Sequence, residues 1–328
     1  MRRRTWAIVA AALVVVAPPL AVSLLLWGHS WGAPDERARS GGCDAVWLGH
    51  AWVDGRRSDQ DVRALVGRLR GSGVRDLFVH AGPVGDDGSL DAALHPRARW
   101  AVGALHAALP GLRVQAWLGQ RVDPGRLDLD DSAARGRVVE SARRALELGF
   151  DGIHYNFEPL PDGHSGLLNL LAATRELTRS RGATLSMSVH HIEPLPLSSH
   201  VDRVVIGHSK FWTAGYLTQV AERVDQIAIM SYDTGLPAES LYAGYVRRQT
   251  RLALDAVPPR IDLLMGLPAY HDGTWTHHPG AETVAAAVRG VRLAIGAESR
   301  LGFGVAIYAD FSAIEADWRD YYAEWVRR

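Results

Sequence analysis

The sequence predicts a closed barrel of eight parallel β-strands with helices between them, a (β/α)8 TIM barrel, preceded by an N-terminal transmembrane helix. From Asp44 onward, strand-like runs alternate eight times with helical patterns, and no change of composition divides these repeats. About 285 residues for eight units fit such a barrel, which typically takes about 250. A doubly wound open sheet is the alternative, but it requires a glycine-rich phosphate turn that the first run lacks.

An uncharged apolar run near the N-terminus, residues 6–28, predicts a membrane anchor. As a helix it spans roughly 33 Å, which is enough for a hydrocarbon core. The basic flank, residues 1–5, is expected to stay in the cytoplasm, so the rest of the chain is expected on the outer side of the cell membrane. The alternative is secretion after cleavage of a signal peptide near Ala21-Val22-Ser23. Residues 29–43 are typical of a short tether, and residues 44–328 are expected to fold alone.

Composition limits the chemistry of the chain. Lys and Arg together number 36, equal to Asp and Glu together, so the net charge does not favour nucleic acid as a partner. Cys43 is the only cysteine, which excludes disulfides within the chain, cysteine-based zinc sites and iron–sulfur clusters. No cofactor is expected.

The eight strand runs and the helices between them follow local signals. The runs begin at Ala45, Val74, Arg113, Phe150, Ala183, Val224, Ile261 and Leu301. Ser58 is the expected N-cap of the first helix, which should stop near Gly71 or Gly73, and Gly149 should close the helix before the fourth run.

The fourth run, FDGIHYNFE, carries the strongest functional signal. With strand periodicity, His154, Asn156 and Glu158 share one face, and the residues between them form an apolar opposite face. Buried polar groups are costly without a task, so this pattern predicts a polar site. Glu158 ends the strand, where barrel enzymes place their catalytic groups.

The other runs end in aromatic and polar residues that a barrel would bring to one mouth. With the fourth run, these residues are His50, Trp52, His80, Trp117, Gln120, His190, His191, Tyr232, Asp233, Tyr270, Tyr308 and Asp310. Aromatic faces beside hydrogen-bonding groups suit a carbohydrate, which is the expected partner. We therefore assign substrate binding to a subset that consists of His154, Trp52, Trp117, Asp233, Tyr270, Tyr308 and Asp310.

Four of these strands resemble motifs of family-18 glycoside hydrolases, the chitinases and related endo-N-acetylglucosaminidases. The fourth run resembles D-G-x-D-x-D-x-E, with His154 and Asn156 in place of the two middle aspartates. The segment 230–233 resembles M-x-Y-D, the segment 266–270 resembles G-x-P-x-Y, and Tyr308 stands where a tryptophan is common. The S-x-G-G motif of the third strand is missing.

The resemblance implies a membrane-tethered, extracytoplasmic glycosidase that acts on β-linked N-acetylated sugars. In the family the last Glu, here Glu158, is the general acid, and the 2-acetamido oxygen of the substrate is the nucleophile. Asn156 takes the place of the Asp that orients the acetamido group, as in the N-x-E of family-85 enzymes. Tyr232 is the third catalytic residue. We expect His154 to be neutral and hydrogen-bonded, because an imidazolium would favour ionised Glu158.

Two other functions remain open at this stage. Chitinase-like lectins share the barrel but usually lack the acid, which is present here as Glu158. The histidines of the mouth allow a metal-dependent amidohydrolase, but the first strand has no H-x-H, and the adjacent His190 and His191 would point to opposite faces. No metal is therefore expected. Trp212, Trp318 and Trp325 fall in helical patterns and are expected to serve packing.

Overall fold

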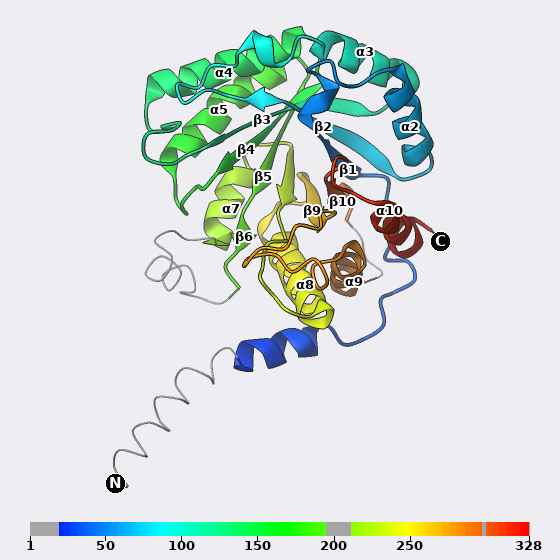
Figure 1. Ribbon diagram of the computed structural model, residues 1–328. Coiled ribbons are helices and arrows are strands. Elements are labelled where there is room, and N and C mark those ends of the chain that lie inside the picture. The colour runs from blue at the N-terminus through cyan, green and yellow to red at the C-terminus, as the bar shows by residue number, and fades with distance from the viewer. Residues whose placement is uncertain (1–19, 195–210, 297–299, 328) are drawn as a thin grey trace, which may run out of the picture.

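The computed structural model describes residues 20–194, 211–296 and 300–327, and it contains a closed parallel barrel (Figure 1). Neighbouring strands follow the order β1-β10-β9-β8-β5-β4-β3-β2. The barrel strands are β1 (Asp44–Leu48), β2 (Val74–Pro83), β3 (Arg113–Arg121), β4 (Gly152–Glu158), β5 (Thr184–Val189), β8 (Gln226–Ile229), β9 (Asp262–Pro268) and β10 (Phe303–Tyr308). Each of the eight predicted runs overlaps one of them, so the predicted barrel is confirmed.

Helices cover the outside of the barrel. They are α2 (Asp59–Leu69), α3 (Ala98–Ala108), α4 (Ser132–Glu147), α5 (Ser165–Ser180), α7 (Ala214–Ala221), α8 (Glu239–Ala256), α9 (Val284–Ile295) and α10 (Glu315–Tyr321). Short turns of helix add η1 (His50–Trp52), η2 (Ala92–Leu94) and η3 (Tyr322–Val326). Ser58 caps α2 as predicted, and Asp61 completes a capping box with it. Gly149, with φ +105°, follows α4 in the left-handed region that glycine tolerates.

A short parallel pair outside the barrel was not predicted. It joins β6 (His191–Ile192) to β7 (Phe211–Trp212). Trp212 is therefore a strand residue, although the sequence pattern indicated a helix, and its side chain is buried in the core. Trp318, in α10, and Trp325, in η3, pack in helices as expected.

The interior of the barrel is filled in layers. At the amino-terminal end of the strands, buried Asp76 accepts hydrogen bonds from Arg113, Gln115 and Gln226 at 2.7–2.9 Å. This network pairs the buried charge and satisfies its oxygens. The layer above it contains aromatic rings, including Trp47. Because these layers fill the lower barrel, an open site can form only at the carboxyl ends of the strands.

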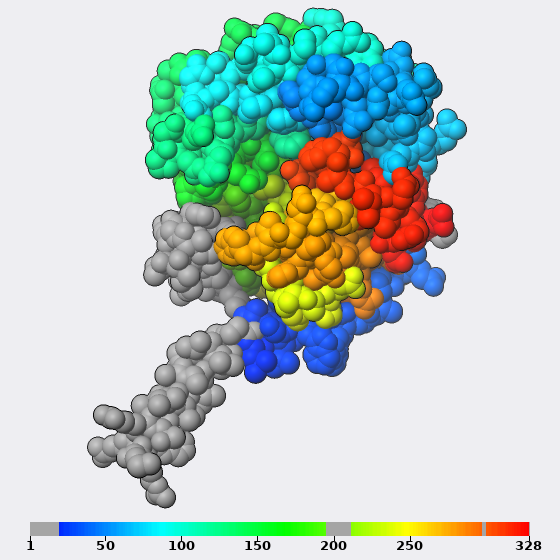
Figure 2. Space-filling view, viewed as in Figure 1, coloured from blue at the N-terminus to red at the C-terminus, as the bar shows by residue number. Residues whose placement is uncertain are grey.

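The segment before the barrel packs against α8 and α9, in contrast to the loose tether that its composition indicated. Residues 20–29 are helical, and Leu26 is buried with its carbonyl oxygen against Gly244, where an added Cβ would lie only 1.9 Å away. Figure 1 shows this helix in dark blue beside α8, and Figure 2 shows dark blue atoms pressed against the yellow surface of that region. The extended stretch that follows is held by arginines.

We call the three arginines that bind this stretch the arginine clamp: Arg247 of α8, with Arg289 and Arg292 of α9. Their guanidinium groups donate to backbone carbonyls of residues 29–38. The buried Arg292 donates to the carbonyls of Ala38 at 2.9 Å and Asp35 at 3.1 Å. The stretch is therefore part of the folded unit.

The predicted membrane anchor lies mostly outside the described residues. Its residues 6–19 lie outside the described part of the chain, which starts at residue 20. In the part of the chain that the structure describes, no helix is both long and apolar enough to cross a membrane.

Candidate active site

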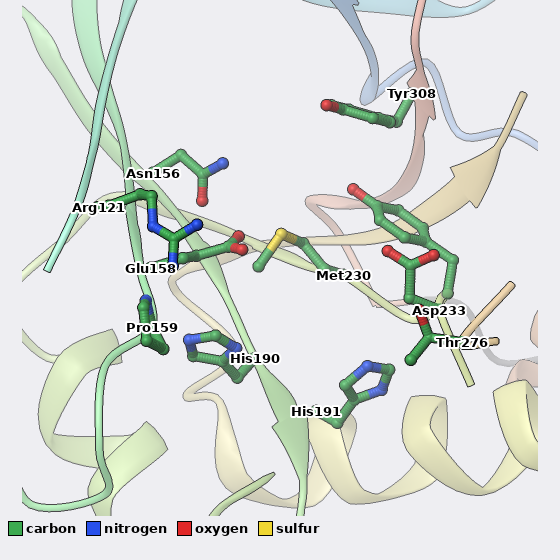
Figure 3. A pocket seen from close by; sticks show the side chains of 11 residues that line it. Arg121, Asn156, Glu158, Pro159, His190, His191, Met230, Asp233, Thr276 and Tyr308 are labelled. Carbon is green, nitrogen blue, oxygen red and sulfur yellow. The ribbon is translucent and has the colours of Figure 1, made fainter. Parts of the chain in front are cut away.

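A pocket of about 440 Å³ opens at the carboxyl ends of the strands. Its lining residues come from five barrel strands or their ends, and one comes from the connection between β9 and α9. They are Arg121, Asn156, Glu158, Pro159, His190, His191, Met230, Tyr232, Asp233, Tyr308 and, from that connection, Thr276. Figure 3 shows Asn156 and Glu158 on one side of the pocket, with Tyr308 and Asp233 across from them.

Glu158 has the properties of a general acid. It is the last residue of β4, and its half-buried side chain lines the pocket. Burial raises the pKa of its carboxyl group to about 7, the negative charge of Asp233 adds to the rise, and a hydrogen bond with Asn156 opposes it. A carboxyl group with this pKa keeps its proton in a large share of molecules near neutral pH, as proton donation requires.

Asn156 presents an unused hydrogen-bond acceptor beside this acid. Its side chain is bonded to Glu158, yet its buried Oδ1 has no hydrogen-bond partner among the described residues. A buried carbonyl oxygen without a partner is costly, and a ligand that donates a hydrogen bond to it would remove that cost. An amide N–H of a ligand would satisfy Oδ1.

Aromatic residues form the wall that faces Glu158. The ring of Tyr232 stacks on that of Tyr308, with centroids 5.5 Å apart and planes 24° apart. Tyr270 meets both rings edge to face, and its hydroxyl donates to Asp233 Oδ1 at 2.7 Å. Burial raises the pKa of Tyr232 well above its usual value, so its hydroxyl stays protonated and able to donate.

His154 lies beneath the pocket, which corrects its assignment to substrate binding. The side chain has no exposed surface, because its ring stacks on Phe78 at 3.8 Å. Its Nε2 accepts from Trp47 Nε1 at 3.1 Å, and both ring nitrogens contact serine hydroxyls. The ring is hydrogen-bonded as predicted, and burial lowers the pKa of His154 to about 3, which favours the neutral form.

Four more predicted substrate-binding residues do not line the pocket: Trp52, Trp117, Asp310 and Tyr270, the last of which instead holds Asp233 through its hydroxyl. Trp52 is 2% exposed and donates from Nε1 to Asp310 Oδ2 at 2.8 Å. The other oxygen of Asp310 accepts from the backbone N–H of Gly49, so this pair closes the barrel where β10 meets β1. Trp117 packs in the inner aromatic layer, with its ring 4.6 Å from that of His80. Trp52 and Asp310 do lie beyond the ends of β1 and β10, whereas Trp117 lies in the middle of β3, and the side chains of all three make their contacts within the fold.

The pocket also contains residues that the sequence did not mark for this site. Arg121, Pro159, Met230 and Thr276 line it. Arg121 directly ends a predicted strand, which was an available signal, whereas Thr276 lies in a connection without any motif.

The adjacent histidines, His190 and His191, both line the pocket, although strand alternation predicted opposite faces. The reason is that β5 ends at Val189, before either residue. His190 Nε2 accepts from the backbone N–H of Leu160 at 3.3 Å, and His191 Nδ1 lies 2.6 Å from the hydroxyl of Tyr245. Across the described ranges, no three His, Cys, Asp or Glu residues form a group able to hold a metal ion.

Comparison with solved structures places the barrel among chitinase-like folds. The spore cortex-lytic enzyme SleL of Bacillus megaterium QM B1551 superposes with a TM-score of 0.61 at 13% identity, covering 88% of this chain and 76% of that one. A chitinase of Chromobacterium violaceum ATCC 12472 gives 0.60 at 16% identity, covering 87% and 99%. A class V chitinase of Pseudomonas fluorescens Pf-5 gives 0.56 at 14% identity, covering 89% and 99%.

These likenesses support the family-18-like fold that the strand motifs predicted. No protein-family model matches the sequence, and no curated protein matches it.

Proposed function

We propose that the chain is a retaining glycoside hydrolase that cleaves β-linked N-acetylated sugars with help from the acetamido group of the substrate. One observation supports this most strongly: Glu158, with its raised pKa, lies next to the unpartnered Oδ1 of Asn156 in the same pocket. The acid and the acetamido-binding group of such a mechanism would both be supplied by β4.

In the first step, Glu158 donates its proton to the glycosidic oxygen, and the bond from that oxygen to C1 breaks. The acetamido carbonyl oxygen attacks C1 on the opposite face and forms a cyclic oxazolinium ion, so no protein nucleophile is needed. Asn156 Oδ1 accepts the acetamido N–H, which orients the group. Tyr232, from the facing wall, is the candidate donor to the acetamido oxygen.

In the second step, the ionised Glu158 takes a proton from water as the water attacks C1. The oxazolinium opens, the acetamido group is restored, and the sugar keeps its anomeric configuration. The neutral state of His154 suits this cycle, because a buried positive charge beneath β4 would stabilise ionised Glu158 and weaken the acid.

The aromatic wall supports carbohydrate as the partner. Tyr308 and Met230 offer apolar surface to the faces of a pyranose ring, and the polar groups lie around them. We include membrane tethering in the proposal, with the barrel on the outer side of the cell membrane. Leu20, Leu24, Leu25 and Trp27 are 46–56% exposed on the helix of residues 20–29, and continued apolar sequence precedes them. Fractionation of cells into membrane and soluble protein tests this part.

The test of the activity uses Glu158→Gln and Asn156→Ala with matched N-acetylated and deacetylated β-linked oligosaccharides. Glu158→Gln keeps the shape of the side chain but loses the proton, so hydrolysis should fall about 10²–10⁴-fold while binding persists. Asn156→Ala should slow only acetylated substrates, because the lost contact needs the acetamido group.

One outcome would leave the carbohydrate-binding barrel as the function. That outcome is wild-type protein that binds acetylated oligosaccharides and cleaves none of them, with Glu158→Gln binding equally well. This second function is tested because Asn156 stands where the family has an aspartate.

A further inference from the structure

Asp233, which faces Glu158, occupies an unfavourable backbone conformation. Its φ of +61° is the single positive value among the non-glycine residues that the structure describes. Residues with a side chain seldom adopt the left-handed region, although Asp tolerates it better than most. Such a residue keeps its conformation only when its surroundings hold it, so neighbouring groups must fix the turn after β8.

Glu282, just before α9, holds the backbone of this turn. Its side chain is 0% exposed and accepts hydrogen bonds from the N–H of Thr234 at 3.1 Å, the hydroxyl of Thr234 at 3.1 Å and the N–H of Gly235 at 3.0 Å. Gly235 N–H also donates to the carbonyl of Thr276 at 2.7 Å. The two residues after Asp233 are thus fixed to the connection between β9 and α9.

His277, from the same connection, supports the side chain of Asp233. The imidazole is 1% exposed and stacks on Tyr270, with centroids 4.1 Å apart. Its Nδ1 lies 3.4 Å from Glu282 Oε2 and 3.7 Å from Asp233 Oδ1. Its Nε2 lies 3.3 Å from the Tyr270 carbonyl, and the Tyr270 hydroxyl donates to Asp233. The ring therefore fills the space between two carboxylates and braces the tyrosine that binds one of them.

We infer that Glu282 and His277 are positioning residues that hold the Asp233 carboxylate opposite Glu158. The inference rests on the proposed role of Glu158 as the acid. Glu282 acts through hydrogen bonds to the turn, and His277 acts through Tyr270 and through contact with Asp233. Asp233, in the turn after β8, would then supply the negative charge near Glu158 that β4 lacks, since the middle positions of β4 are His154 and Asn156.

Several ionisable groups surround Asp233 and must be considered together. From the packed elements they are Glu158 of β4, Tyr232 after β8, Tyr242 of α8, Tyr270 after β9, His277 and Glu282 of the β9–α9 connection, and Tyr308 of β10. Among the charges, Asp233 is the one that raises the pKa of Glu158. Substitutions at Glu282 or His277 should therefore change the pKa of Glu158 by displacing Asp233.

The experiment measures the titration of Glu158 directly, by NMR of full-length protein labelled with ¹³C at glutamate carboxyl groups. The Glu158 signal is identified by its loss in Glu158→Gln. Asp233→Asn should move the midpoint down by roughly one pH unit, because the like charge is lost. His277→Phe and Glu282→Ala should move it in the same direction, and neither should move it further when combined with Asp233→Asn.

Kinetics provide a second readout. Glu282→Ala and His277→Phe should each lower kcat about tenfold or more with little change in KM, because a displaced group near the acid costs rate rather than binding. Glu282→Gln keeps an acceptor oxygen for the turn and should recover most of the loss. His271→Gln is the matched control, since it lies on the same connection but pairs with Asp317 of α10 at 3.0 Å.

The outcomes separate this inference from the proposed function. The wild type could show no hydrolysis while the titration midpoints of Glu158 shift as stated. In that case the positioning role stands and the proposed hydrolase function is wrong. An upward shift in His277→Phe would show that the ring acts by its own charge, and additive shifts in the double variants would show a route that bypasses Asp233. Either result overturns the inference. Thermal melting checks folding, and Glu282→Gln keeps the test valid if Glu282→Ala does not fold.

Discussion

Replacing Asn156 with Asp should raise the pKa of the acid at Glu158. The amide of Asn156 is hydrogen-bonded to Glu158 and lowers its pKa, whereas a carboxylate there would be a like charge. At about 4–5 Å and an effective dielectric constant of about 20, Coulomb's law gives roughly 3–4 kcal/mol, or about 2–3 pKa units. The two carboxyl groups would share one proton as a coupled pair, and the loss of that proton should move from near pH 7 to about pH 9.

The assay is the pH profile of kcat/KM between pH 4 and 10 on an N-acetylated oligosaccharide. At pH 8 the protonated fraction of an acid with a pKa of about 7 is roughly 9%, and with a pKa of about 9 it is roughly 91%. The rate of Asn156→Asp relative to its own maximum should therefore be about tenfold higher than that of the wild type at pH 8. Asn156→Ala is the control, because it removes the hydrogen bond without adding charge. The coupling between the side chains at positions 156 and 158 would be refuted if kcat/KM of Asn156→Asp declined at an alkaline pH no higher than that of Asn156→Ala.

Three further predictions concern stability. A chain that starts at residue 44 should melt roughly 6–12 °C below one that starts at residue 29. The reason is that the buried Arg292 loses two hydrogen-bond acceptors, which together contribute about 3 kcal/mol to stability. Equal melting points would contradict this. Acid should weaken the fold, because the pKa of buried His154 is lowered to about 3 and the unfolded chain takes up its proton near pH 6.5, which costs roughly 3 kcal/mol between pH 6.5 and 4. In denaturant melts, the free energy of unfolding should fall less steeply with decreasing pH in His154→Gln than in the wild type. His278→Gln, which changes an exposed residue, should behave like the wild type. Trp52→Phe should lower the free energy of unfolding by about 1–2 kcal/mol, by removing a donor to buried Asp310, and should leave KM unchanged; a large rise in KM would restore Trp52 to substrate binding.

The barrel was predictable because its signals are local and repeated. Each buried strand appears as a short apolar run, and caps such as Ser58 and Gly149 mark the helices between them. The central pair of the pocket, Asn156 and Glu158, was predictable for the same reason, because alternation along a single strand decides which side chains face the mouth.

Depth along the strand limited the rest of the site prediction. Alternation assigns a face but not a layer, so His154 and Trp117 were grouped with the pocket although both lie below it. The histidines after β5 were misplaced because alternation stops where the strand stops. Glu282 and His277 were not found at all, since their contacts join segments distant in sequence and no motif marks them.

The arginine clamp also limits how far the pocket can reach from the segment before the barrel. A domain on a flexible linker samples many orientations, and its encounters with substrate depend on the length of that linker. Here residues 29–38 are fastened to the middle of α8 by Arg247 and to α9 by Arg289 and Arg292. If a bilayer holds the upstream run, the pocket is kept within a limited distance of the surface, because residues 29–38 add no free length of linker. Only glycan strands that pass through that narrow zone would be cut, and position rather than affinity would then decide which bonds are broken.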